Sequence, residues 1–321
     1  MRALIFNKTG SLDDLNLQEI SKPTLAADEI LVQVKAAAVN PSDIKNVLGK
    51  MHETTLPRVP GRDFAGIVVE GPDELRGKPV FGSGGGLGFS RDGSHAEYLA
   101  VPLNGVVPLP SGYNFAQAAA TGLPFITAWG SMVDAAKVRE GETVLILGAT
   151  GAVGGAAARI VHALGAHVIG TLRNASDSSA GDLPVDHWID LSKTELPAGV
   201  REAMGGRGAD VVFDVVGGAM FEKCLASLAP RGRQVAISSS PDPVVSFNLV
   251  DFYHNQSQLL GFDSLKLSLE QSAAILRSAA PHFESGKFPP PRVEIFPLAD
   301  GVRIYREIAA GKIKAKAVLE P

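Results

Sequence analysis

The chain has 321 residues, enough for about two domains at roughly 150 residues each. Apolar residues make up 45% and charged residues 20%, a balance that excludes a disordered or fibrous protein. The net charge is −4, from 30 Lys and Arg against 34 Asp and Glu, which gives no general affinity for nucleic acid or anionic membranes.

The single cysteine, Cys224, excludes an internal disulfide framework and a cysteine-rich structural zinc site. One unpaired thiol is typical of a reducing compartment. Met1–Gly10 holds no apolar stretch of signal-peptide length, and no run of about 18 apolar residues predicts a membrane span. We therefore expect a cytoplasmic protein that binds neither nucleic acid nor membrane.

The first third of the chain predicts a β-rich region. Short segments rich in Leu, Ile and Val, separated by prolines, are typical of strands. They are Met1–Phe6, Leu15–Ile20, Glu29–Val39, Asp63–Glu70 and His95–Val101. The glycine-rich stretch Gly82–Gly88 predicts either a flexible loop over a site or a cluster of surface turns.

From Phe115 the pattern becomes helical as far as Lys137, and strand-like runs then alternate with helical stretches. The expected strands are Thr143–Leu147, His167–Leu172, His187–Asp190, Ala209–Asp214, Gln234–Ser238 and Leu259–Phe262. Repeated β–α units with nearly continuous apolar strands favour a doubly wound parallel sheet. The tail predicts a helix at Leu269–Ser285 and a final strand at Lys312–Leu319.

A glycine-rich turn follows the first of these strands and carries the strongest chemical signal. The run Gly148–Gly154 reads GATGAVG, and a predicted helix, Ala152–Leu164, grows out of it. Glycines here allow a tight turn and a close approach of backbone to a pyrophosphate, which the helix N-terminus also attracts. The alternative is a glycine turn that binds nothing, but the strand–turn–helix context favours a dinucleotide site. The expected contacts are Thr150, Gly151, Ala152, Val153 and Gly154.

The end of the second strand indicates which dinucleotide binds. An NAD site usually has an acidic residue there, on the ribose 2′-hydroxyl. This chain has Arg173 followed by Asn174, with no adjacent acid. A guanidinium suits a 2′-phosphate, so we expect NADPH and count both residues among its contacts. The alternative is that Arg173 is a solvated charge at a strand end.

Five further stretches carry a family resemblance: Val39–Asp43, Pro60–Gly66, Ser94–Pro102, Gly208–Gly218 and Gly311–Leu319. On them the chain resembles, over essentially its whole length, the medium-chain dehydrogenase/reductase superfamily, and within it the zinc-free quinone oxidoreductase (zeta-crystallin-like) branch. The resemblance implies an α/β fold. A β-rich GroES-like catalytic domain would comprise residues 1–120 and 263–321, and a Rossmann NADPH-binding domain with a doubly wound parallel sheet residues 121–262. It also implies a cofactor in the cleft between them, and a homodimer.

The resemblance allows zinc to be tested residue by residue. The alcohol dehydrogenases of this superfamily have Cys where Asn40 stands, His where Arg62 stands and Glu where Asp63 stands. An amide and a guanidinium are not usual zinc ligands, so no metal is expected. Without a Lewis acid, simple alcohol oxidation loses the group that stabilises the alkoxide. The expected substrate is therefore an activated acceptor, a quinone or a conjugated carbonyl.

Catalytic candidates come from the first matching stretch. The resemblance implies that Asn40 lies near the nicotinamide or the acceptor carbonyl, with Asp43 one short turn on. The alternative is a turn and helix cap, for which Asn, Pro, Ser and Asp are also suited. Arg62 and Asp63 are expected to form an ion pair at the position that holds zinc in the alcohol dehydrogenases.

Four more cofactor contacts are expected in the middle of the chain. Thr127 resembles a family threonine that contacts the nicotinamide end. Val216, Ser238 and Phe262 follow the fourth, fifth and sixth predicted strands. In an open α/β sheet, ligands bind at these carboxyl ends.

Because the sequence departs from the family pattern at some positions, it does not determine the substrate. Met51 stands where many quinone reductases and enoyl-thioester reductases have Tyr, which disfavours an enoyl-thioester substrate. Three functions remain: an NADPH-dependent reductase of quinones or conjugated carbonyls, a zinc-free dehydrogenase or reductase of another small carbonyl, and a non-catalytic NADPH-binding sensor or structural protein.

Overall fold

The computed structural model describes residues 1–173, 181–239 and 242–321. These residues form two compact units. Unit 1 comprises Met1–Leu123 and Ser264–Pro321, and unit 2 comprises Pro124–Asp263. Each combines helices with its own sheet, so the α/β fold class predicted from the sequence is confirmed.

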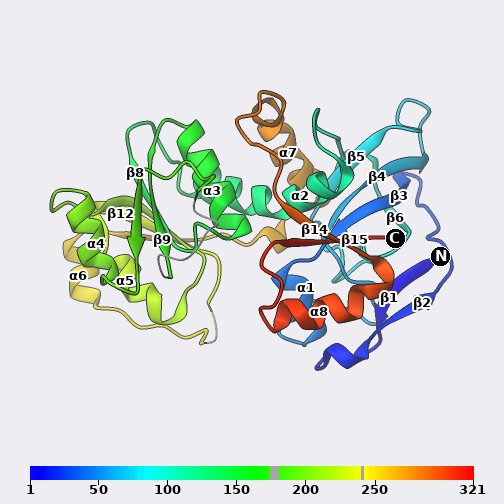
Figure 1. Cartoon of the computed structure of the whole chain (residues 1–321), viewed down its shortest axis with the longest axis horizontal. Coiled ribbons are helices and arrows are strands. Elements are labelled where there is room, and N and C mark those ends of the chain that lie inside the picture. Colours follow the sequence, from blue (N-terminus) through cyan, green and yellow to red (C-terminus); the bar gives the residue numbers. More distant parts are fainter. Residues whose placement is uncertain (174–180, 240–241) are drawn as a thin grey trace. The chain divides into compact units, whose positions relative to one another are not determined.

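Unit 1 is built on a sheet that joins the two ends of the chain (Figure 1). Its order among the described residues is β14 (Val293–Pro297), β15 (Lys316–Glu320), β3 (Glu29–Ala38), β4 (Asp63–Glu70), β5 (Pro79–Ser83) and β7 (Val107–Pro108), with β6 (Tyr98–Pro102) also paired to β3. In the pairing of β15 with β3, Val318 lies opposite Ala38. Strands β1 (Arg2–Phe6) and β2 (Leu15–Glu19) form a separate antiparallel pair.

Helices cover the core of unit 1. They are α1 (Pro41–Val47), α7 (Leu269–Glu284) and α8 (Gly301–Ala309). One buried cluster includes Ile30, Phe64 and Leu269, and another includes Phe6, Val47 and Tyr305. The stretch after Asn40, expected as a turn or cap, forms helix α1, which Pro41 begins with a backbone dihedral already suited to a helix.

Unit 2 holds a parallel sheet. Within its described residues the strand order is β10 (His187–Asp190), β9 (His167–Leu172), β8 (Thr143–Ile146), β11 (Ala209–Asp214), β12 (Leu228–Ala236) and β13 (Gln258–Gly261). In chain order this is third, second, first, fourth, fifth and sixth, the doubly wound Rossmann order, so this prediction is confirmed.

The helices of unit 2 pack along this sheet (Figure 1). They are α3 (Ala152–Ala163), which contacts β8 and β9, α4 (Leu196–Ala203), which contacts β10, and α5 (Phe221–Leu225), which contacts β11 and β12. A further short helix, α6 (Leu249–His254), precedes β13. Helix α2 (Phe115–Trp129) crosses the boundary between the units and continues as a π-helical stretch, Gly130–Ala135. In the described part of the chain, no helix has both the length and the apolar character needed to cross a bilayer.

The glycine-rich stretch Gly82–Gly88 is packed rather than open. Several of its glycines have positive φ, among them Gly84 (+97°) and Gly85 (+57°). A Cβ built on Gly85 would lie 2.6 Å from the backbone nitrogen of Leu269, the first residue of α7. Only glycine allows so close an approach of two backbones. The stretch is therefore packed against the start of α7, and whether it is flexible stays a prediction.

Candidate functional site

The turn between β8 and α3 in unit 2 has the features of a phosphate-binding loop. Gly148 has φ +64°, and a Cβ on Gly154 would lie 2.2 Å from the Gly148 carbonyl oxygen. The loop therefore closes tightly on the start of α3. The N–H groups in the first turn of a helix have no hydrogen-bond acceptor within the helix. Here the N-cap residue is Gly151, which has no side chain that could accept those hydrogen bonds. These amides suit a pyrophosphate, so the residues present fit a dinucleotide.

The other expected cofactor residues of unit 2 lie mostly at one edge of its sheet. Val216 follows β11, Ser238 follows β12 and Phe262 follows β13, and parallel strands end at a common edge. Phe262 packs closely on Gly130, where an added Cβ would lie 2.1 Å from its ring. Thr127 lies on α2 and is buried. The topology thus brings Val216, Ser238 and Phe262 to the edge that carries the phosphate loop.

The residue expected to select NADPH is accessible. Arg173 directly follows β9 and is exposed, so its guanidinium is available to an anion. Asn174 lies outside the described residues. One residue of β9 also supports the phosphate loop, because the Thr171 hydroxyl accepts from the Gly148 N–H at 3.2 Å.

A buried carboxylate that was not among the expected site residues organises the same edge. Oδ1 of Asp214, the last residue of β11, accepts from the N–H groups of Val216 (3.0 Å) and Gly217 (2.8 Å), while Oδ2 accepts from Gln234 Nε2 (3.2 Å). Burial raises the pKa of this carboxyl above its usual range. The only sequence signal was the acidic residue directly after the apolar run 211–213.

In unit 1 the structure brings Asn40 and Asp63 together with Lys316, which the sequence had not marked. Asn40 Nδ2 donates to Asp63 Oδ2 at 2.9 Å, and the other carboxylate oxygen accepts from the Leu123 N–H at 2.7 Å. Lys316 Nζ donates to Asn40 Oδ1 and lies 3.8 Å from Asp63 Oδ2. The guanidinium of Arg62, expected to pair with Asp63, donates to the Ser264 carbonyl oxygen at 3.1 Å.

Asp43 lies beside this group and is completely buried. Its Oδ2 accepts from the Asn40 N–H at 2.8 Å, as a helix-capping residue does. Its Oδ1 has no hydrogen-bond partner among the described residues. Burial, with a smaller contribution from the neighbouring charge of Asp63, raises the pKa of Asp43 to about 7, against the opposing effect of the Asn40 N–H. The side chain therefore titrates near neutral pH.

Two further buried groups of unit 1, His95 and Tyr305, are hydrogen-bonded to each other. His95 Nε2 faces the Ala38 carbonyl oxygen at 3.3 Å, and because a carbonyl only accepts, Nε2 carries the proton. His95 Nδ1 then accepts from the Tyr305 hydroxyl at 2.8 Å. Burial lowers the pKa of His95 to about 4, which keeps the imidazole neutral.

The donor set at this position does not fit zinc. The Asn40 amide already donates on one side and accepts on the other, and the Asp63 carboxylate accepts from two donors. The Lys316 ammonium group lies beside both side chains. A structural or catalytic zinc site needs thiolate, imidazole or free carboxylate ligands. Throughout the described ranges, no three His, Cys, Asp or Glu side chains gather in a way that could hold a metal ion.

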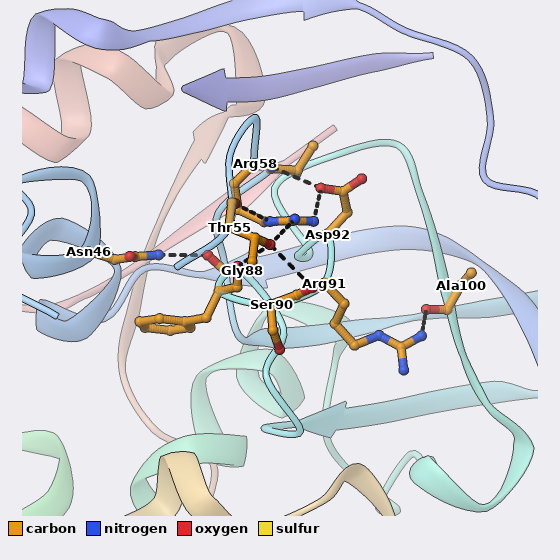
Figure 2. Close-up of polar contacts among 10 residues, drawn as sticks. Asn46, Thr55, Arg58, Gly88, Ser90, Arg91, Asp92 and Ala100 are labelled. Atoms are coloured by element: carbon orange, nitrogen blue, oxygen red, sulfur yellow. Dashed lines mark hydrogen bonds and ion pairs between the residues drawn. The ribbon is translucent and has the colours of Figure 1, made fainter. Parts of the chain in front are cut away.

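The loops around residues 50–57 and 82–93 of unit 1 are joined by polar contacts (Figure 2). Arg58 donates to Asp92 Oδ1 at 2.8 Å and to the Thr55 carbonyl oxygen at 2.9 Å, and Asn46 Nδ2 donates to the Gly88 carbonyl oxygen at 2.6 Å. A pocket of about 410 Å³ lies beside these loops, where Phe89 and Leu265 form part of its wall.

Comparison with known families identifies both halves of the chain. Residues 26–111 match the alcohol dehydrogenase GroES-like domain, and residues 152–277 match the family described as zinc-binding dehydrogenase. Together these matches span most of the chain and fall on both units.

Curated relatives match over nearly the full length. A zinc-type alcohol dehydrogenase-like protein of Schizosaccharomyces pombe is 35% identical over 90% of this chain and 86% of its own. The human quinone oxidoreductase is 28% identical over 97% and 94%. A 2-methylene-furan-3-one reductase of Solanum lycopersicum is 30% identical over 100% and 79%.

Solved structures agree on the fold. An alcohol dehydrogenase superfamily protein from Novosphingobium aromaticivorans superposes with a TM-score of 0.90 at 28% identity, covering 100% of this chain and 99% of that one. A crystal structure of an NAD-dependent alcohol dehydrogenase superposes with a TM-score of 0.89 at 29% identity, with 100% of both chains covered.

Proposed function

Because this chain belongs to the quinone oxidoreductase-like branch of the medium-chain dehydrogenase/reductase superfamily, whose members are oxidoreductases that bind a nicotinamide dinucleotide, we propose that it is a zinc-independent, NADPH-dependent reductase of quinones or α,β-unsaturated carbonyls. The observation that carries the proposal is the polar group of unit 1. An amide and an ammonium group lie beside Asp63 where the alcohol dehydrogenases bind their metal.

The cofactor part of the proposal rests on unit 2. The phosphate loop supplies the first-turn amides of α3, and the exposed Arg173 supplies a cation where the ribose 2′-phosphate of NADPH would lie. NADPH would bring the hydride; the chain binds and orients it. Thr127, Val216, Ser238 and Phe262 are proposed as the remaining contacts. Asn174 stays in the proposal on the sequence alone.

The acceptor part rests on the chemistry available in unit 1. Asn40 retains one amide hydrogen that can be donated to a carbonyl oxygen, on which negative charge develops as hydride is added. Asp43 accepts from the Asn40 N–H, so we propose that it acts by holding the Asn40 backbone. A hydrogen-bond donor polarises a carbonyl group less than a zinc ion does. A site of this kind therefore favours acceptors that conjugation already activates towards hydride addition.

The named relatives also support this acceptor class. One is a quinone oxidoreductase and another reduces a 2-methylene-furan-3-one, a conjugated ketone by its name. A soluble small molecule in the reducing cytoplasm is the partner that the proposal requires, and a homodimer is the proposed assembly.

The proposal is tested by following NADPH oxidation in excess chelator, with an ortho-quinone and a 2-alkenal as parallel acceptors. We expect turnover of at least one, unchanged by the chelator. Turnover that the chelator abolishes would contradict zinc independence. Tight NADPH binding without turnover of any acceptor would instead indicate a nucleotide sensor or structural protein, and alcohol-driven reduction of NADP⁺ would indicate a dehydrogenase of another small carbonyl.

A further inference from the structure

A lysine lies in the interior of unit 1, and its environment is unusual for this residue type. The Lys316 side chain is 11% exposed, and lysine is rarely buried unless its charge is paired. Its Nζ donates to Asn40 Oδ1 and lies 3.8 Å from Asp63 Oδ2. Strand β15 brings it there through its pairing with β3, from 276 residues away in the sequence.

The contacts of Lys316 determine which way the Asn40 amide points. An ammonium group only donates hydrogen bonds, so the amide atom beside Lys316 must be the oxygen. A carboxylate only accepts, so the atom beside Asp63 must be the nitrogen, at 2.9 Å. A flipped amide would place N–H against N–H and oxygen against oxygen. With both neighbours in place, Asn40 is held in one orientation and has one N–H left to donate.

We propose that Lys316 is a positioning residue for hydride transfer, which fixes the Asn40 amide so that its remaining N–H is presented to the acceptor oxygen. This role of Lys316 rests on the proposed function, in which Asn40 donates a hydrogen bond to the acceptor oxygen. Without the ammonium group, only Asp63 still opposes the flipped orientation of the amide, so a larger fraction of the molecules presents the amide oxygen instead. Such a presentation would repel the developing negative charge instead of stabilising it.

The test compares the steady-state kinetics of Lys316→Met and Lys316→Arg with those of Lys314→Met, the matched control on an exposed lysine two residues earlier. Lys316→Met should lower kcat by about 10-fold or more, as does the loss of a donor to a developing oxyanion, while NADPH affinity and the acceptor KM change little. Lys316→Arg keeps the charge and should recover most of the rate. Lys314→Met should behave as the wild type.

A double-mutant cycle with Asn40→Ala separates positioning from a general structural effect. If Lys316 acts through Asn40, then Lys316→Met adds little further loss when Asn40 is already alanine. Should Lys316→Met fail to fold, Lys316→Gln provides the same comparison with a neutral side chain. Independent, additive losses in kcat, or a Lys316→Met enzyme as fast as the wild type, would overturn this inference alone. Absence of turnover in the wild type would overturn the proposed function, and this inference with it.

Discussion

At the scale of single residues, the side chains proposed to select the cofactor and those proposed to act on the substrate lie in different units. Arg173 is exposed at the end of β9, whereas Asn40, Asp43 and Asp63 are buried in unit 1. The sequence marked Arg173 and Asn40 because each follows a recognisable strand or motif. Lys316 could not be found in this way, since only the register of β15 against β3 brings it to Asn40.

Reversing the charge at Arg173 should weaken NADPH binding selectively. Arg173→Glu replaces the proposed donor to the 2′-phosphate with a repelling carboxylate, so the NADPH dissociation constant should rise by about 100-fold, the cost of one charge-assisted hydrogen bond. NADH, which has no 2′-phosphate, should lose far less affinity. Fluorescence titration of both nucleotides measures the two effects, and equal losses would remove Arg173 from the 2′-phosphate site.

The titration of Asp43 should appear in the pH dependence of stability. Its pKa is raised to about 7 in the folded chain from its ordinary value of 3.8, so between these pH values the native state holds a proton that the unfolded state has released. The stabilisation that protonated Asp43 gives to the folded state is therefore complete below about pH 4 and is lost as the pH rises through 7.

Asp43→Asn removes this titration while keeping an acceptor for the Asn40 N–H. Its Tm minus that of the wild type should become more positive between pH 4 and 7 and then level off. Subtracting the wild-type Tm at each pH removes the pH dependence that comes from other groups with a raised pKa, such as Asp214, because both proteins contain them. A Tm difference that stays constant across this range would show that Asp43 is ionised throughout.

At the scale of elements, the limits of a strand were predicted correctly where the strand is a short run of mostly apolar residues. Strands β4, β9, β10 and β11 have the predicted limits, because they are short apolar runs bounded by turns. Strand β12 begins at Leu228, six residues before the predicted start, since Pro230, Arg231 and Gly232 break the apolar pattern. Strands β5 and β14 and helix α8 were not predicted; β14 shows a largely exposed side-chain pattern and depends on pairing with β15.

The loop after β11 offers a test of how one buried carboxylate supports the cofactor edge. Asp214→Ala leaves the N–H groups of Val216 and Gly217 without their acceptor, which should cost about 2–4 kcal/mol of unfolding free energy and weaken nucleotide binding. Asp214→Asn is the matched control. Its oxygen can accept from both amides, and Gln234 can turn its amide to accept from the new N–H. Chemical denaturation that ranks the two variants equally would contradict this account of the loop.

At the scale of the whole molecule, the division into two units follows from the sheets. The sheet of unit 1 contains strands from both ends of the chain. The change in composition near Phe115 is visible in the sequence, but only the family resemblance implied that the two ends join. The family and the α/β fold are confirmed. NADPH, the acceptor, the absence of a metal and the assembly stay predictions.

A homodimer is expected, and unit 2 has a surface suited to it. Among the described residues, strand β13 is the last strand of its sheet, and Leu259 on it is exposed. Leu249, Val250 and Tyr253 on α6, which precedes it in the chain, are more than half exposed. An unpaired strand edge beside apolar side chains favours association. Sedimentation equilibrium should give twice the 33.5 kDa chain mass.

Two variants locate that surface. Tyr253→Lys should shift the protein to a monomer, whereas Ile295→Lys, at an exposed apolar residue of unit 1, should not. A wild-type monomer at micromolar concentration would contradict the predicted dimer.

The central claim is that this chain moves a hydride from NADPH to a carbon atom of an activated acceptor without a metal ion. The most direct measurement is deuterium transfer from NADPH labelled on one face of C4 to a 2-alkenal, with zinc-depleted protein and mass spectrometry of the product. We predict one deuterium per saturated aldehyde from one labelled face and none from the other. Unlabelled product from both faces, or transfer that requires added zinc, would contradict the claim.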